Sequence, residues 1–367
     1  MTPSPAAPAR ILFVHLGGIG DVVLAFPAIK SLRETFPAAS ITMLVESRAR
    51  GIGTFNPAID EVLVFDAKGN PTLGDFLGLV GQLRGRAFDL AIASGRSAAM
   101  AGLLWLTGAR RRIGYDASPL AWTLTTAVPL SPRQYAGDMY YDLVAPLVAI
   151  PPRLPQLAVC PEDRSWASGF LSASGLAEGE PFAVLHPGAS RIAEVRGIRK
   201  TWDPLRWTAL ASALRAEGLP VVIAGGPDDD AIVRQILARA EQDTDSPGKL
   251  VVAYGKTQQL GQLAALIELG SVLIAVDSAP MHIGIAVGTP TVGIFGPTDP
   301  DKLLPAGTVH QAVHVAGLAC RPCLWDRRKT TCDELTCIKT LTVDTVLTAV
   351  WRALPSAQRA KVDSRAE

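Results

Sequence analysis

Short apolar runs alternate with longer segments of helical spacing through almost all of this chain of 367 residues. In the first half, four such runs have the length and composition of buried strands: residues 11–16, 40–46, 61–66 and 89–94. Segments with helical spacing lie between them, such as residues 27–36 and 73–86. This alternation is typical of parallel sheets covered by helices, and it predicts an α/β fold.

A proline-rich stretch, residues 150–163, breaks this pattern before it resumes. The second series has helices near 204–217 and 228–241 and apolar runs at 182–188, 219–226, 250–255, 271–278 and 290–296. The chain is longer than one hydrophobic core usually supports, and clusters of proline mark linkers. We therefore expect two Rossmann-like, doubly wound domains facing a central cleft, residues 1–160 and residues 161–340.

The end of the chain has a different composition. Residues 341–355 have helical spacing, and the Thr342–Asp344 segment supplies plausible N-terminal caps. Residues 356–367 are polar, so we expect them to be disordered.

The charge balance argues against a nucleic-acid partner, because 35 basic residues face 34 acidic ones. Residues 1–160 carry 14 basic against 11 acidic residues, and Arg110, Arg111 and Arg112 are consecutive. Such arginines could meet an anionic acceptor or a membrane surface, or simply form a solvated face. The first ten residues lack the apolar stretch of a secretory signal, and no apolar run approaches the ~20 residues of a spanning helix. We expect a cytoplasmic protein, at most peripheral to the inner membrane.

The segment HLGGIGDVVLAFPAIKSL, residues 15–32, has the outline of a dinucleotide-binding fingerprint. Gly18 and Gly20 fill the first two glycine positions, but Val23 occupies the third and Asp21 begins the helix. A pyrophosphate bound by such a fingerprint lies at the helix N-terminus, where a carboxylate would compete with it. The segment is therefore a poor dinucleotide site.

Two interpretations of Asp21 remain open from the residues alone. Aspartate can cap its own helix, which contributes roughly 1 kcal/mol. Alternatively, Asp21 is a general base, because open α/β sheets place their ligands at the carboxyl ends of strands.

A second informative segment, residues 275–300, reads AVDSAPMHIGIAVGTPTVGIFGPTDP. Its strand ends at Asp277, and Ser278, Ala279 and Pro280 then open a helix that contains His282. The amides of a first helical turn form an anion site, to which Ser278 and His282 can add donors. The competing interpretations are a buried core histidine for His282 and a loop-orienting role for Asp277.

The third segment, residues 186–207, joins HPGAS to KTWDP through an arginine-rich loop. Lys200 can reach a phosphate as a flexible point charge, and Ser190 can donate a hydrogen bond. We interpret Arg191, Arg196 and Arg199 as solvated loop charges. The acids of GGPDDD, residues 225–230, either cap a helix or hold a ribose hydroxyl, and capping is the favoured interpretation.

Taken in order, these motifs resemble glycosyltransferase family nine, the heptosyltransferases that add heptose from ADP-heptose to the lipopolysaccharide core. The resemblance is carried by GGIGDVVLAFPAIKSL, by HPGAS with KTWDP, and by DSAPMH followed by GTP and FGPTDP. It extends over residues 10–350. One residue separates Trp202 from Pro204, and the loop before Lys200 is longer than in the common pattern.

The resemblance implies a GT-B fold, an acceptor on the N-terminal domain, a nucleotide sugar on the C-terminal one, and an inverting transfer that needs no metal or other cofactor. Asp21 would deprotonate the acceptor, and Gly17, Gly18 and Gly20 would keep its turn uncluttered. Residues for the donor would be Ser190, Lys200, Asp277, Ser278, Ala279, Pro280, Met281 and His282. The terminal helix would cross back to the first domain. ADP-heptose and a glycolipid would be the partners of a monomeric enzyme.

Four cysteines, Cys320, Cys323, Cys332 and Cys337, follow the spacing C-x2-C-x8-C-x4-C. Thiolates two residues apart suit a structural zinc or iron, although the middle loop is shorter than in common zinc ribbons. Some related heptosyltransferases that act on autotransporters hold iron in a comparable cluster. Reduced thiols and a disulfide are the alternatives, and no catalytic role is expected.

Other functions remain to be weighed against this one. Family members could use another nucleotide sugar or a protein acceptor. A GT-B-fold sugar-nucleotide epimerase would need further acid/base carboxylates, and the motifs fit it poorly. A non-catalytic nucleotide-sugar-binding protein would not need Asp21, Lys200 and His282 together.

Overall fold

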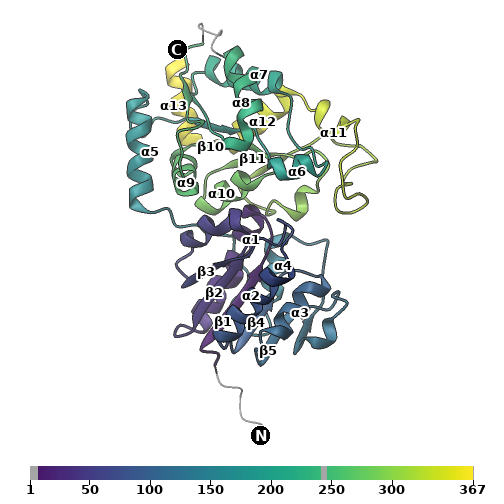
Figure 1. The fold of residues 1–367 in the computed structure, drawn as a ribbon. Helices are drawn as coiled ribbons and strands as arrows, with labels where there is room; N and C mark the ends of the chain where they lie inside the picture. The colour runs from purple at the N-terminus through teal and green to yellow at the C-terminus, as the bar shows by residue number, and fades with distance from the viewer. Residues whose placement is uncertain (1–6, 241–245, 367) are drawn as a thin grey trace. The chain divides into compact units, whose positions relative to one another are not determined.

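A computed structural model describes residues 7–240 and 246–366 of the chain. The chain divides into two compact units between Ala158 and Val159, inside the proline-rich stretch (Figure 1). Three predicted segments extend beyond the described residues. These are the start of the first domain, residues 1–6; the last residue of the helix expected at 228–241; and the last residue of the tail expected at 356–367. No helix in the described ranges is long and apolar enough to cross a membrane.

The first unit contains a parallel six-stranded sheet in the order β3-β2-β1-β4-β5-β6. Its strands are β1 (Arg10–His15), β2 (Ser40–Val45), β3 (Glu61–Val64), β4 (Leu90–Ala93), β5 (Arg111–Tyr115) and β6 (Thr126–Val128). Its helices are α1 (Ile19–Thr35), η1 (Ser47–Phe55), α2 (Leu73–Gly85), α3 (Ala98–Leu106), η2 (Ala121–Thr123) and α4 (Ala136–Asp142). Leu12 pairs with Thr42 on one side and with Ala91 on the other, so β1 is the central strand.

Burial on both faces explains why these strands are continuous apolar runs rather than alternating ones. From Ile11 to Val14 every side chain of β1 is fully buried. One face contributes Leu12 and Val14 to a cluster that also contains Leu44 and Ala91. Helix α1 begins at Ile19, earlier than the expected 27–36 segment, and Pro27 lies inside it.

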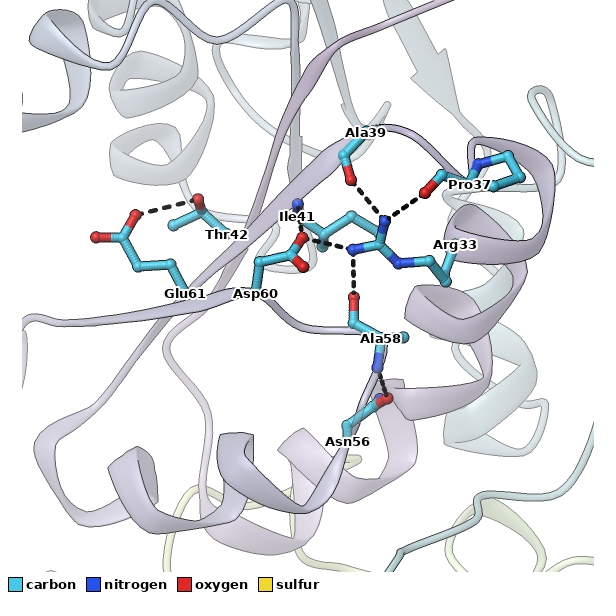
Figure 2. Close-up of polar contacts among 9 residues, drawn as sticks. All are labelled: Arg33, Pro37, Ala39, Ile41, Thr42, Asn56, Ala58, Asp60 and Glu61. Carbon is cyan, nitrogen blue, oxygen red and sulfur yellow. Dashed lines mark hydrogen bonds and ion pairs between the residues drawn. The ribbon is translucent and has the colours of Figure 1, made fainter.

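Arg33, in the last turn of α1, ties that helix to the start of β2 and the loop before β3 (Figure 2). Its guanidinium donates to the carbonyl oxygens of Pro37, Ala39 and Ala58 and to the carboxylate of Asp60. Asp60 in turn accepts a hydrogen bond from the backbone N–H of Ile41 at 2.7 Å. The carboxyl-terminal end of α1 is therefore fixed to the sheet.

The second unit contains another parallel six-stranded sheet, in the order β12-β11-β10-β7-β8-β9. Its strands are β7 (Ala183–His186), β8 (Val221–Ile223), β9 (Leu250–Val252), β10 (Val272–Val276), β11 (Thr291–Ile294) and β12 (Gln311–Val313). Read from β9, this is the order of the first sheet, with β7 in the place of β1 and β10 in the place of β4. The predicted fold class, α/β with two Rossmann-like domains, is confirmed.

The helices of the second unit are α5 (Pro161–Ala173), α6 (Arg191–Val195), α7 (Pro204–Ala216), η3 (Pro227–Asp229), α8 (Asp230–Ala240), α9 (Leu260–Leu269), α10 (Ala279–Val287), η4 (Pro300–Lys302), α11 (Thr336–Lys339), α12 (Val343–Ala353) and α13 (Ser356–Ala366). Most of them flank the sheet closely (Figure 1).

The end of the chain differs from the expectation in two respects. Helix α12, which we expected to cross back to the first domain, belongs to the second unit and packs against α7, β10, β11 and β12. Its Val346 and Val350 are fully buried in the core of that unit. The tail that we expected to be disordered forms α13, because Val362 inserts into the same core and is 1% exposed.

Candidate functional site

The turn that follows β1 places the Asp21 carboxylate at the carboxyl edge of the first sheet. Gly18 is the N-cap of α1, and its backbone N–H donates to Asp21 Oδ2 at 2.8 Å. Asp21 thus caps its own helix, as one of the two interpretations requires, and it is only partly buried. Among the described residues it forms no ion pair. One carboxylate oxygen is therefore held by the backbone, and no ion pair commits the group to a cation.

Gly17 allows two reactive groups to approach each other closely. A Cβ atom at this position would lie 2.5 Å from His15 Nε2 and 2.8 Å from the Cβ atom of Asp21. Both distances are shorter than real Cβ contacts, so any larger residue would displace His15 or Asp21. Gly18 is similarly placed, between Asp21 and the guanidinium of Arg48. Gly20 is buried in the first turn of α1.

Tyr140, whose ring packs on His15, contacts the other carboxylate oxygen of Asp21. The Tyr140 hydroxyl, from α4, donates to Asp21 Oδ1 at 3.4 Å, a long hydrogen bond. The rings of His15 and Tyr140 meet edge to face with their centroids 4.9 Å apart. Burial and the charge of Asp21 raise the pKa of Tyr140 well above 10, so its hydroxyl keeps its proton. Asp21 therefore accepts hydrogen bonds at both oxygens.

His15 is neutral at physiological pH. Burial lowers its pKa to about 4, although the nearby charge of Asp21 acts in the opposite direction. The Nδ1 atom lies 2.6 Å from Ser94 Oγ, just beyond β4. Among the described residues Nε2 has no hydrogen-bond partner. The imidazole beside Asp21 is consequently uncharged.

In the second unit, Asp277 follows β10 and is paired with Lys200. Lys200 Nζ lies 3.1 Å from Asp277 Oδ2, and both side chains are largely buried, 12% and 5% exposed. Burial favours the neutral carboxyl, yet the charges of Lys200 and His282 outweigh it and lower the pKa of Asp277. Nζ also lies 5.4 Å from the centre of the Trp325 ring. Asp277 is therefore an ionised carboxylate that orients the ammonium group of Lys200.

The helix that follows Asp277 offers fewer free amides than the sequence indicates. Ser278 is the N-cap of α10, and its hydroxyl donates to the carbonyl oxygen of Val276 at 3.3 Å. Pro280 has no N–H, and the N–H of Met281 donates to the Ser278 carbonyl oxygen at 3.1 Å. Met281 is fully buried, so its side chain belongs to the core. The donors left for an anion are the amides of Ser278 and Ala279.

The residue expected to contact the donor from the HPGAS loop is Ser190, the N-cap of the short helix α6, and it is partly buried. The arginines of this loop differ from one another. Arg199 forms a salt bridge with Asp333 at 2.6 Å, whereas Arg191 and Arg196 are exposed. The solvated interpretation therefore holds for two of the three.

The acids of the GGPDDD turn are held by contacts within the protein. Asp229 accepts a hydrogen bond from the N–H of Gly226 at 2.7 Å, and its carboxylate lies 3.6 Å from His186 Nε2. A Cβ atom at Gly188 would lie 1.7 Å from Asp229 Oδ1, so glycine is required there. Asp228 accepts from the N–H of Arg191, and Asp230 is bonded to Tyr254. These contacts agree with capping rather than ribose binding.

A comparison with known proteins decides the family. The model of glycosyltransferase family 9 (heptosyltransferase) matches residues 77–333. The chain belongs to glycosyltransferase family 9. Lipopolysaccharide heptosyltransferase 3 of Escherichia coli is 30% identical over 290 residues, which cover 76% of this chain and 81% of that protein. Family membership makes the protein a glycosyltransferase of the heptosyltransferase type, related to enzymes of lipopolysaccharide synthesis.

Solved structures support the family fold. A glycosyl transferase family 9 protein from Veillonella parvula is 28% identical, with a TM-score of 0.70, over 83% of this chain and 85% of that one. The ADP-heptose lps heptosyltransferase II of E. coli has a TM-score of 0.73 at 21% identity, over 96% and 99% of the two chains. The family match begins after the first three strands, so Asp21 lies outside the matched residues 77–333.

The four clustered cysteines of this family 9 chain are all free thiols. Cys323 and Cys337 are buried, Cys320 is exposed and Cys332 is intermediate. Burial, together with the neighbouring Cys323 and Cys332, raises the pKa of Cys337 to about 11. In the described part of the chain, no group of three or more His, Cys, Asp or Glu side chains could hold a metal ion. The described residues therefore show no assembled ligand group, and the structural zinc or iron that the spacing suggested stays a prediction.

Three residues around the candidate base have no role predicted by a sequence motif: His15, Ser94 and Tyr140. His15 stands at the end of the strand next to the glycine turn, which is a usable signal for a buried group at the sheet edge. Ser94 follows β4, the neighbour of β1, so topology brings it close. Tyr140 is 119 residues from Asp21 and belongs to no motif. Only the packing of α4 on α1 brings it to the carboxylate.

Proposed function

We propose that this protein transfers a heptose from ADP-heptose to a lipopolysaccharide-core acceptor by an inverting mechanism that needs no metal ion. The observation that carries the proposal is the Asp21 carboxylate, which is oriented at both oxygens and forms no ion pair among the described residues. A carboxylate that is fixed but not neutralised is suited to accept a proton. Family membership and the name of the similar E. coli enzyme support ADP-heptose as the donor.

In this mechanism Asp21 takes the proton of an acceptor hydroxyl. The acceptor oxygen attacks the anomeric carbon of the heptose as the bond between that carbon and the diphosphate oxygen breaks, and ADP leaves. Direct displacement from the opposite face inverts the anomeric configuration. One base suffices for this reaction, and neutral His15 and Tyr140 leave that base without a competing charge.

The second unit would stabilise the charge that develops on the leaving diphosphate. Lys200 is held in place by Asp277, and its ammonium group has further N–H donors that can point to a phosphate oxygen. The amides of Ser278 and Ala279 at the start of α10 would add hydrogen bonds and a favourable helix dipole. Ser190, Pro280 and His282 would shape the same donor site, with Met281 supporting it from the core.

The test compares Asp21→Asn with wild type on ADP-heptose and truncated core lipid. Loss of the base should lower kcat by about 10²–10⁴-fold, while calorimetry shows unchanged binding of the donor. Asp75→Asn is the matched control, because Asp75 caps α2 from the same helical position without any proposed role. Equal loss of activity in the two variants would contradict the proposed base. A requirement for Mg²⁺ after treatment with EDTA would contradict the metal-independent step.

The identity of the transferred sugar needs its own measurement. We expect ADP-heptose to bind and react in preference to other nucleotide sugars in a calorimetric donor screen. The product should show the inverted anomeric configuration by NMR. Transfer from another nucleotide sugar, transfer to a protein, or epimerisation without transfer would each replace the proposed activity by a different one.

A further inference from the structure

The segment between β12 and α11 has no part in the proposed transfer, yet it carries an exposed tryptophan next to the donor lysine. Trp325 is 57% exposed, and the centre of its ring lies 5.4 Å from Lys200 Nζ. A tryptophan side chain gains much free energy from burial, so an exposed one beside a buried ammonium group calls for a physical reason.

The backbone of Trp325 is strained. Its φ is 67°, and among the four non-glycine residues with positive φ in the described ranges it has the largest side chain. This region is sterically unfavourable for bulky residues, because Cβ approaches the following carbonyl oxygen. Such strain persists only where surrounding contacts impose it, and it is frequent at functional sites. The fold therefore holds Trp325 in a conformation that a tryptophan disfavours.

The contacts that impose this conformation anchor residues 321–328, which we name the strap. The backbone N–H groups of Cys323 and Leu324 both donate to the carbonyl oxygen of Pro297, at 2.9 and 3.1 Å. The guanidinium of Arg321 donates to the carbonyl oxygens of the residues on either side of Pro297, at 2.6 and 2.9 Å. The strap is thus fixed to the loop that follows β11.

The chain just beyond the strap is bonded to the loop that carries Lys200. The carbonyl oxygen of Gly197 accepts hydrogen bonds from both the N–H and the hydroxyl of Thr331, each at 2.9 Å. The hydroxyl oxygen of Thr331 accepts in turn from the N–H of Arg199, the residue before Lys200, at 3.1 Å. Backbone contacts therefore hold the two loops together on either side of the pair formed by Trp325 and Lys200.

Lys200 has two neighbours that favour its charge at this position. One is the carboxylate of Asp277 at 3.1 Å, and the other is the indole ring of Trp325. A cation within about 6 Å of an indole face is attracted by the negative face of the ring, and more strongly where water is excluded. The Lys200 side chain is only 12% exposed, so little water surrounds the ammonium group. Its remaining N–H donors are available to a phosphate.

We propose that Trp325 is a positioning residue for Lys200, whose ammonium group its indole face fixes and shields from water. The inference rests on the proposed transfer, in which Lys200 stabilises the leaving diphosphate. A shielded ammonium group interacts more strongly with a growing negative charge, because the local dielectric constant is lower. Trp325 acts through Lys200 and touches no reacting atom, and the strap serves to present it.

The first measurement is the rate of a single turnover with ADP-heptose and truncated core lipid, which excludes product release. Trp325→Leu keeps an apolar cover but loses the aromatic face, and it should lower this rate by about tenfold. Trp325→Phe keeps an aromatic face and should stay within about threefold of wild type. The Kd of ADP-heptose should change by less than about threefold in both, because the charge on the diphosphate grows only as the bond breaks.

A double-mutant cycle separates an effect through Lys200 from a direct contact with the donor. The background is Lys200→Met/Asp277→Asn, which removes the cation without leaving a buried unpaired acid. In this background Trp325→Leu should change the single-turnover rate by less than about twofold, since the group that Trp325 positions is absent.

Binding of ADP alone, measured by calorimetry, tests the same contact without acceptor or sugar. ADP carries the charge of the departed leaving group, so Trp325→Leu should weaken its binding by about threefold or more, and not at all in the Lys200→Met/Asp277→Asn background. Trp351→Leu is the matched control. It removes another tryptophan–cation contact of the same unit, with Arg359 at 5.8 Å, and should change neither ADP binding nor the turnover rate of the folded enzyme.

Three results would overturn the proposal. Trp325→Leu with the turnover rate and ADP affinity of wild type would show that the ring does not act on Lys200. Equal losses in Trp325→Leu and Trp325→Phe would show that the aromatic face is not what matters. A loss that persists in the Lys200→Met/Asp277→Asn background would make Trp325 a direct donor contact.

The proposed function can fail separately from this inference. Wild-type protein that binds ADP but transfers no heptose contradicts the proposed transfer, while the calorimetric cycle still tests Trp325. Wild-type protein that does not bind ADP overturns both. Circular dichroism of each variant checks that the exposed substitution leaves the fold intact.

Discussion

The two units carry the same sheet with aspartates in opposite surroundings. Both sheets have one strand order, and the equivalent strands β1 and β7 each end in a buried histidine, His15 and His186. Asp21 follows the first of these strands, forms no ion pair among the described residues, and has neutral His15 and Tyr140 beside it. Asp277 follows β10, the neighbour of β7, and meets the ammonium group of Lys200 at 3.1 Å. Two sheets of the same strand order therefore hold two different carboxylates. Asp21, without an ion pair in the described part of the chain, can accept a proton, whereas Asp277 is paired with the ammonium group of Lys200.

The two histidines at the ends of β1 and β7 also differ in their partners. Burial lowers the pKa of both His15 and His186, so each is neutral in the folded protein. His15 is oriented by the hydroxyl of Ser94, whereas His186 faces the carboxylate of Asp229 at 3.6 Å. The first unit therefore places neutral His15 and Tyr140 next to the proposed base. In the second unit the buried carboxylate of Asp277 is paired with Lys200, and that of Asp229 lies beside His186.

The largest effect that tests this contrast is expected from Lys200→Met. The variant leaves Asp277 as a buried, unpaired carboxylate, which should cost about 3–5 kcal/mol of unfolding free energy in urea denaturation. Removal of a charge that stabilises the leaving group should also lower kcat by about 10²–10³-fold. Asp21→Asn, in contrast, should cost only the cap, roughly 1 kcal/mol.

Two further variants isolate the pair. Lys200→Met/Asp277→Asn removes both charges and should recover most of the lost stability but none of the activity. Lys302→Met breaks the more exposed pair with Asp326 in the same unit and should change stability by less than about 1 kcal/mol. If Lys200→Met were no more destabilising than Lys302→Met, the buried pair would not distinguish the second unit from the first.

The next effect concerns the stability of the first unit as a function of pH. The pKa of His15 is about 4 in the folded protein and near 6.5 when the chain unfolds. As pH falls from about 6.5 to 4, the unfolded chain takes up a proton that the folded one does not. The folded state should lose about 3 kcal/mol over this window through His15.

His15→Gln checks this contribution. Thermal unfolding followed between pH 4 and pH 7 should show a shallower loss of stability in the variant than in wild type. His186→Gln gives the corresponding measurement for the second unit. An unchanged pH dependence in His15→Gln would mean that His15 is not held neutral, and the uncharged surroundings of Asp21 would need another explanation.

The smallest effect is expected from Tyr140→Phe, which removes one of the two hydrogen bonds to Asp21. The 3.4 Å bond is long, so we expect a loss of about fivefold in kcat, with KM and donor binding unchanged. Tyr141→Phe, one residue further along α4, is the control. A change in donor binding instead of kcat would remove Tyr140 from the group that orients the base.

Much of this architecture follows from the sequence because buried parallel strands are continuous apolar runs. The strands at 11–16, 40–46, 182–188 and 271–278 all correspond to strands in the structure, within one or two residues at their ends. Strand β5 begins with Arg111 and Arg112, and β6 and β12 have three residues each. Such strands lack an apolar run and were not predicted. Their pairing depends on neighbouring strands rather than on their own composition.

Two helices show how packing overrides local signals. Pro27 lies inside α1, which runs unbroken from the helix start that the motif places at Asp21 through residues 27–35, because almost all side chains from Val22 to Leu32 are buried. Residues 356–366 are polar enough to suggest disorder, yet a single apolar residue, Val362, anchors them to the core. Neither outcome is visible in a local window of sequence.

In the candidate site, too, local sequence predicts some features and tertiary packing determines the others. Asp21, Lys200 and Asp277 could be selected because they stand at strand ends or in short motifs, where a parallel sheet collects its ligand-binding residues. The contact between Lys200 and Asp277 joins residues 77 apart, and that between Tyr140 and Asp21 joins residues 119 apart. Such contacts are fixed by tertiary packing, so the sequence identified the groups but not the partners that set their charge.

The position of Trp325 against Lys200 gives this enzyme an optical signal of its own. The ring is 57% exposed and lies 5.4 Å from the ammonium nitrogen, so any ligand that draws Lys200 toward a phosphate changes the electric field at the indole. Tryptophan emission is sensitive to such fields. The chain contains seven tryptophans, and Trp325→Phe would subtract this one response from the total. Donor occupancy can therefore be followed in unlabelled protein by a fluorescence difference between two otherwise identical samples.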